Sequence, residues 1–292
     1  MIDHASVQLS RRSTPFWPPL SLRLAAATAV LALSGLGLFT IGSRAEGLAD
    51  IKARGYMLAV TEDDFRPFEF VEDGVSKGYD NDILVEIKKS LPFDVHQEIL
   101  PWAGILPGVT TGKYDIAVTA VLVTAVRKPT FDFASPVAQS TTFYATKAGS
   151  SINAPTDLND KTVGAQAGSA MLADLQAFDA ELKAKGGPGL KKIVEYPSNP
   201  EAYQDLALGR TDAVVNTEIN LRSLLDERKG VFALGQAIAK PVYIAWALKK
   251  GNTDTLKLID DALLALRQNG KMYELQQKWF GVTFKDMPAS AN

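Results

Sequence analysis

The stretches GKYDIAV, at residues 112–118, and GRTDAVV, at residues 209–215, decide the fold of this 292-residue chain. In both, a glycine is followed by a basic residue, one further residue, an aspartate and then an apolar run. This order is typical of a helix that ends at glycine and is followed at once by a buried strand. Glycine-capped turns between helix and strand are common, but the repeat favours two lobes of similar construction, each of about 100 residues.

Segments that alternate between strand and helix surround the two stretches. The apolar runs Tyr56–Thr61 and Thr162–Gln166 predict buried strands. Asp80 and Asn199 stand where they can cap helices, and Thr253–Asn269 has the apolar spacing of an amphipathic helix. This alternation indicates α/β units with mainly parallel sheets. Two such lobes in one chain enclose a cleft, and small ligands bind preferentially at interfaces between domains.

Residues 1–45 have the layout of a secretory signal peptide. Arg11, Arg12 and Arg23 precede the uncharged apolar run Leu24–Ile41, and Ser43 and Ala45 then place small residues at the two positions that matter for cleavage. We predict cleavage after Ala45 and a protein that is free in the periplasm. The alternative is an uncleaved membrane anchor, because the apolar run approaches the ~20 residues that span a bilayer.

The composition excludes several classes of function. The chain has no cysteine and two histidines, which excludes disulfides, thiolate chemistry and metal sites built from several histidines. The net charge is −2 and no basic stripe is present, so we expect no nucleic-acid partner. Carboxylates are plentiful, but no spacing among them selects a general acid–base pair. We therefore predict no catalytic residues, no metal and no cofactor.

Arg127 is the strongest candidate for a binding residue. It follows a buried strand and a polar turn, and the carboxyl ends of strands are where α/β sheets bind their ligands. Its planar guanidinium can hold a carboxylate through two parallel hydrogen bonds. The alternative is a surface arginine that pairs with Asp132.

Other candidates come from the ends of neighbouring elements. Ser169 opens a helix directly after a strand, so its surroundings form either an anion site or an ordinary helix cap. Phe65 and Trp102 can enclose the carbon chain of a ligand or pack in the core. Glu62 begins an acidic cluster that either pairs with a cationic ligand or forms a solvated turn.

A series of short segments in chain order resembles one known family, the polar amino-acid type of bacterial ABC-transporter solute-binding proteins. Each segment is weak evidence by itself, but together they span nearly the whole chain after residue 45. The segments are Phe65–Phe70, Gly78–Asp82, Trp102–Pro107, Gly112–Asp115, Thr124–Arg127, Phe131–Pro136, Asp157–Ser169, Gly209–Ala213 and Lys278–Gly281.

The resemblance implies an α/β, two-lobed periplasmic binding protein fold of type II, with a ligand cleft between the lobes. Two crossing strands, near residues 138–142 and 237–242, would form the hinge. Lobe 1 would comprise residues 46–138 plus 241–292, and lobe 2 residues 139–240. The lobes would close on the ligand.

The implied function is that of the extracytoplasmic solute-binding component of an ABC importer. The ligand would be an amino acid or an amino-acid-like carboxylate, and the partner an ABC permease in the inner membrane. We expect a monomer. Two alternatives remain open, namely a dehydratase-like enzyme on the same fold, with Glu218 or Glu62 as its acid, and an anchored ligand-sensing domain.

The resemblance also implies roles for individual residues. Arg127 would bind the α-carboxylate of the ligand. Phe65 and Trp102 would flank the ligand side chain, and Glu62 would recognise a cationic tip. The backbone around Thr119, Ala120, Ser169 and Ala170 would assist Arg127 in binding the carboxylate.

Two positions depart from the family pattern. Leu122 stands where the family usually has a hydroxyl, and Thr217 where it usually has the aspartate that binds the α-ammonium. Glu218 is adjacent, although neighbouring residues at a strand end can point in opposite directions. The departures suggest a modified amino acid or a carboxylate without a primary amine.

Overall fold

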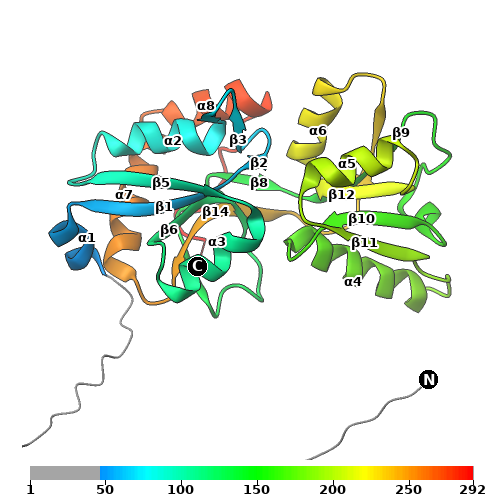
Figure 1. The fold of residues 1–292 in the computed structure, drawn as a ribbon, viewed down its shortest axis with the longest axis horizontal. Coiled ribbons are helices and arrows are strands. Elements are labelled where there is room, and N and C mark those ends of the chain that lie inside the picture. The colour runs from blue at the N-terminus through cyan, green and yellow to red at the C-terminus, as the bar shows by residue number, and fades with distance from the viewer. Residues whose placement is uncertain (1–46, 292) are drawn as a thin grey trace, which may run out of the picture. The chain divides into compact units, whose positions relative to one another are not determined.

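The computed structural model describes residues 47–291, so the predicted signal peptide lies outside the described residues. Two larger sheets organise this part of the chain (Figure 1). The first is six-stranded, with the order β5-β1-β6-β14-β7 and with β8 also paired to β14. Its strands are β1 (Tyr56–Glu62), β5 (Asp94–Leu100), β6 (Ile116–Leu122), β7 (Phe131–Phe133), β8 (Ala138–Ser140) and β14 (Val242–Lys249).

The second sheet is five-stranded and repeats the plan of the first. Its order is β11-β10-β12-β9-β13, and in each sheet three parallel strands are followed by an antiparallel one. Its strands are β9 (Thr142–Lys147), β10 (Thr162–Gln166), β11 (Lys192–Tyr196), β12 (Ala213–Thr217) and β13 (Phe232–Ala237). The chain passes to this sheet between β8 and β9 and returns between β13 and β14.

The helices pack on the sheet with which they are interleaved, and this defines two lobes (Figure 1). Lobe 1 also carries a small sheet of β2 (Asp64–Phe65), β3 (Glu69–Glu72) and β4 (Val75–Lys77). Its helices are α1 (Leu48–Arg54), α2 (Tyr79–Lys88), α3 (Trp102–Thr111), α7 (Thr253–Gln268) and α8 (Lys271–Phe280). Lobe 2 has α4 (Ala170–Ala184), α5 (Asn199–Ala207), α6 (Glu218–Glu227) and a short 3-10 turn at Pro155–Leu158.

The repeated sequence stretches have the same structural role in both lobes. Each leads into the third strand of its sheet, β6 or β12. The Oδ2 atom of Asp115 accepts a hydrogen bond from the backbone N–H of Leu58 at 2.7 Å, and that of Asp212 accepts one from Thr162 at 2.8 Å. The aspartate therefore ties the start of β6 or β12 to the parallel strand beside it, β1 or β10, which explains why both stretches carry it.

The two predicted helix caps are wrong. Helix α2 begins after Gly78, whose φ of 118° and contact with the Phe68 carbonyl leave no room for a side chain. Asp80 is instead fully buried and accepts a hydrogen bond from Trp246 Nε1 at 2.8 Å. Helix α5 is capped by Ser198, and Asn199 is its first residue. Both side chains bond to residues distant in sequence, Asp80 to Trp246 and Asn199 to Asn216, and not to the start of their own helix.

None of the helices within residues 47–291 has the length and apolar character needed to cross a membrane. The core is formed by the apolar faces of both sheets and the helices that cover them. In lobe 1, for example, Val118, Ile83 and Trp246 are fully buried, and in lobe 2 Val163 and Leu175 are. The carboxyl ends of β1 and β10, and the turn after β6, supply polar side chains to the site described next.

Candidate functional site

Arg127 lies in the turn after β6 and is half-buried. Its Nη1 donates to the carbonyl oxygen of Leu122 at 3.1 Å, and its Cζ lies 5.3 Å from the centre of the Trp102 ring. Burial lowers the pKa of Arg127 to about 10, and Asp174 opposes this shift, so the guanidinium remains a cation at neutral pH. The alternative pairing with Asp132 is wrong, because Asp132 accepts a hydrogen bond from Lys250 Nζ at 2.6 Å.

Arg127 lines a narrow cavity between the two lobes, which we call the Arg127 pocket. About 10 Å³ of it is open to a water-sized sphere. Most of the residues predicted for the site come together here. The lining residues are Glu62, Phe65, Trp102, Ala120, Leu122 and Arg127 from lobe 1, and Gln166, Ser169, Ala170 and Met171 from lobe 2.

The start of α4 forms the lobe 2 side of this pocket. Ser169 caps the helix, and its Oγ accepts a hydrogen bond from the backbone N–H of Leu172 at 3.0 Å. The remaining backbone N–H groups of a first helical turn have no partner within the helix and carry a partial positive charge. A guanidinium and a helix N-terminus therefore belong to one pocket, and both favour an anion.

Glu62 lies on the pocket wall with only 3% of its surface exposed, so the prediction of a solvated turn is wrong for this residue. It accepts a hydrogen bond from Gln166 Nε2 at 2.6 Å, which joins lobe 1 to lobe 2. Burial raises the pKa of Glu62 to about 8, although the Gln166 bond opposes the shift. At neutral pH this carboxyl group is therefore mostly neutral in the folded chain.

Three residues predicted for the site lie outside this lining. Thr119 donates its hydroxyl hydrogen to the buried Glu69. Thr217 is fully buried and caps α6, where its hydroxyl bonds to Asn220. Glu218 accepts a hydrogen bond from Arg222 Nη2 at 2.6 Å, one turn along the same helix.

Gln166 and Met171 were missed by the sequence reasoning. Gln166 could have been found, because it is a polar residue at the carboxyl end of a buried strand, immediately before the segment that opens α4. Met171 carries no such signal, since an apolar residue in the first turn of a helix ordinarily belongs to the core.

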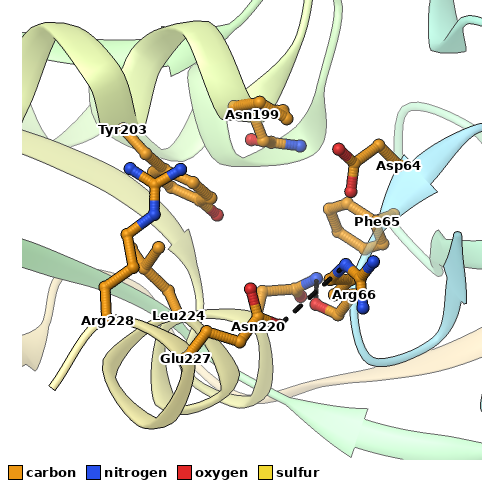
Figure 2. Close-up of a pocket in the computed structure, with 10 residues that line it drawn as sticks. Asp64, Phe65, Arg66, Asn199, Tyr203, Asn220, Leu224, Glu227 and Arg228 are labelled. Carbon is orange, nitrogen blue, oxygen red and sulfur yellow. Dashed lines mark hydrogen bonds and ion pairs between the residues drawn. The ribbon is translucent and has the colours of Figure 1, made fainter. Parts of the chain in front are cut away.

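A second cavity of about 180 Å³ also lies between the lobes, and no sequence pattern predicted it (Figure 2). We call it the Asn199 pocket. Phe65 lines both this cavity and the Arg127 pocket. Its lining residues are Asp64, Phe65, Arg66, Asn199, Pro200, Tyr203, Asn220, Leu224, Glu227 and Arg228.

Comparison with known proteins assigns the family. Residues 57–282 match the family described as bacterial extracellular solute-binding proteins, family 3. This chain belongs to that family, as the resemblance predicted.

Individual relatives agree with this assignment. The L-arginine-binding protein of Pseudomonas aeruginosa is 32% identical over 228 residues, which cover 74% of this chain and 84% of the relative. The L-cystine-binding protein TcyJ of Escherichia coli (strain K12) is 28% identical over 245 residues, covering 81% and 87%. A crystal structure of the substrate binding protein of an amino acid ABC transporter superposes with a TM-score of 0.69 at 27% identity, covering 78% of this chain and 100% of that one. These relatives are binding proteins, and the two-lobed fold is shared with them.

Proposed function

We propose that this chain captures an amino acid, or an amino-acid-like carboxylate, in the Arg127 pocket and delivers it to an ABC permease. The observation that carries the proposal is the half-buried Arg127 in one pocket with the N-terminus of α4 from the opposite lobe. Both groups favour a carboxylate, and partial burial strengthens their attraction for it. The names of the relatives, which bind L-arginine and L-cystine, support an amino acid as the solute.

The other walls of the pocket suit the remaining parts of such a ligand. Phe65 and Trp102 are buried aromatic residues that can enclose a carbon chain. Glu62 is neutral when the lobes are closed on one another, but a cationic ligand tip would favour its ionised form and lower its pKa. The same residue can therefore serve a cationic ligand as a carboxylate and a neutral one as a hydrogen-bonding acid.

Entry of the ligand requires the lobes to separate. The 10 Å³ open in the Arg127 pocket is about the space of one water molecule and is too small for an amino acid. We propose that the lobes open about the β8–β9 and β13–β14 crossings and close again on the ligand. Residues 139–240 would move as lobe 2.

We further propose that the chain acts in the periplasm, after removal of residues 1–45, as a monomeric binding protein and not as an enzyme. The relatives named above are binding proteins, which supports this reading over the dehydratase-like alternative. A bound ligand should be recovered chemically unchanged after prolonged incubation with the protein. A new product in the mixture would favour the enzyme, and an N-terminus at residue 1 on the purified protein would favour the anchored sensor.

Thermal unfolding of the purified protein against a panel of amino acids tests the main proposal. A ligand at ~100 times its Kd should add ~2.7 kcal/mol to the free energy of unfolding. For a protein of this size, that raises the Tm by several degrees, at ~2–4 °C per kcal/mol.

Arg127→Ala should abolish the shift, because it removes the charged partner of the ligand carboxylate. The matched control is Arg210→Ala, since Arg210 is an exposed arginine of lobe 2 that pairs with Asp205. A full shift retained in Arg127→Ala, or no shift with any amino acid or carboxylate, would contradict the proposal.

A further inference from the structure

The Asn199 pocket contains a buried amide whose hydrogen-bonding capacity is not used. Asn199 has 3% of its surface exposed, and its Nδ2 has no hydrogen-bond partner among the described residues. Its Oδ1 accepts a hydrogen bond from Asn216 Nδ2 at 3.0 Å, which fixes the orientation of the amide. Figure 2 shows the nitrogen of Asn199 on the side of the pocket where Asp64 lies. Because buried polar groups are nearly always satisfied, this donor indicates a site for an oxygen of a ligand.

The same cavity is lined by charges of both signs. Arg66 and Arg228 are the cations, and Asp64 and Glu227 are the anions. Burial raises the pKa of Asp64, and the charges of Arg66 and Arg228 oppose the shift. These charges gather around one cavity of about 180 Å³, so the cavity offers partners to a carboxylate and to an ammonium at once.

Two observations connect this cavity with the Arg127 pocket. Phe65 lines both cavities. Glu62, on the wall of the Arg127 pocket, lies close enough to Tyr203 of the Asn199 pocket that its charge helps to raise the pKa of the tyrosine, a shift due mainly to burial. The two cavities are therefore neighbours that share Phe65 as a wall, and a shift of this side chain would join them.

We propose that the Asn199 pocket is a second subsite, which binds the distal head of an elongated amino acid. The ligand would carry an α-carboxylate for Arg127 at one end and a second amino-carboxylate head at the other. Asn199 Nδ2 and Arg228 would bind the distal carboxylate, and Asp64 and Glu227 would bind the distal ammonium. This inference rests on the proposed function and narrows its ligand to amino acids with two such heads.

Titration calorimetry with a matched series of ligands tests the subsite. LL-diaminopimelate has two amino-carboxylate heads, L-lysine lacks its distal carboxylate, and L-2-aminopimelate lacks its distal ammonium. L-cystine is a second two-headed probe. We expect both two-headed ligands to bind at least ~10-fold more tightly than the two truncated ones, because each truncation loses a charge-assisted hydrogen bond.

Equal affinity for lysine and diaminopimelate would overturn the subsite. If that binding were also lost in Arg127→Ala, the proposed function would survive while the subsite failed. Failure of every amino acid to bind would overturn both proposals together.

Two variants separate the subsite from a general loss of structure. Asn199→Asp removes the free Nδ2 donor but keeps an oxygen that can accept from Asn216. We expect it to weaken diaminopimelate binding at least ~10-fold and not to weaken lysine, because the new carboxylate repels a distal carboxylate and not a distal ammonium. Arg228→Gln, at the end of α6, should show the same selectivity without introducing a negative charge.

The control is Asn153→Asp, which makes the same change of charge at an exposed position of the same lobe. It should leave both affinities unchanged. Equal weakening of lysine and diaminopimelate in Asn199→Asp and Arg228→Gln would mean that the residues only support the fold, and would overturn the proposal.

Discussion

At the scale of single residues, Glu62 makes stability depend on pH. Its pKa is about 8 in the folded chain, against an ordinary value of 4.5. The unfolded chain therefore loses this proton near pH 4.5 and the folded chain only near pH 8, so folding becomes less favourable as the pH rises between these values. Above pH 8 the loss is complete, and below pH 4.5 it is absent.

Glu62→Gln should remove this dependence, because the amide imitates the neutral acid and keeps an oxygen for Gln166. We expect the variant to be more stable than the parent at pH 8 by about 1–3 kcal/mol and nearly equal to it at pH 4.5. Urea unfolding at both values measures the difference. Glu195→Gln, at an exposed strand position, serves as the control. A stability difference that is the same at both pH values would show that Glu62 is already ionised in the folded protein.

The sequence predicted those site residues that stand at recognisable places. Arg127 follows a buried strand, Ser169 opens a helix, and Phe65 and Trp102 belong to motifs of the family; all of them line one pocket. The Asn199 pocket could not be predicted in this way, because it forms where β2 of one lobe meets α5 and α6 of the other. Local patterns carry no information about how two lobes meet.

At the scale of elements, the two repeated aspartates should differ in their contribution to stability. Asp115 is buried and bonds to both the Leu58 N–H and Arg54, whereas Asp212 is exposed and bonds to the Thr162 N–H. Removal of Asp115 leaves a buried donor and a cation without that partner, while water can replace Asp212.

We therefore expect Asp115→Ala to lower the free energy of unfolding by about 2–4 kcal/mol and Asp212→Ala by about 1 kcal/mol. Urea unfolding of both variants, with the exposed Asp226→Ala as control, provides the measurement. Equal losses would mean that burial does not distinguish the two turns.

The elements themselves were more predictable than their ends. The apolar pattern of the sequence correctly predicted two strands and one helix, because a long pattern of this kind shows which face of an element is buried. These elements are the strands Tyr56–Glu62 and Thr162–Gln166 and the helix Thr253–Gln268. Helix starts depend on single side chains, and a tertiary partner can outweigh a capping preference of about 1 kcal/mol. Asp80 and Asn199 both illustrate this, since Trp246 and Asn216 are their partners.

At the scale of the whole molecule, few polar bonds join the two lobes across the pockets described above. Gln166 Nε2 donates to Glu62 at 2.6 Å, and Asn220 Nδ2 donates to the carbonyl oxygen of Arg66 at 2.6 Å. Arg66 Nε also lies 4.0 Å from Glu227 Oε1. A net contribution of about 0.5–1.5 kcal/mol from each bond is comparable with the difference between open and closed states in hinged proteins. Under the proposed hinge motion, the loss of a single such bond should therefore shift the population of open and closed states measurably.

Gln166→Ala should favour the open state, because closure would then bury the Glu62 carboxyl group without its partner. We expect the ratio of closed to open molecules without ligand to fall about threefold to tenfold. Small-angle scattering should show a larger radius of gyration for the free variant than for the free parent, and saturating ligand should bring both to one value. Gln204→Ala, an exposed glutamine on α5, should behave like the parent. If the radius did not change with ligand or with Gln166→Ala, the lobes would form one rigid body and ligand entry would need a route other than hinge opening.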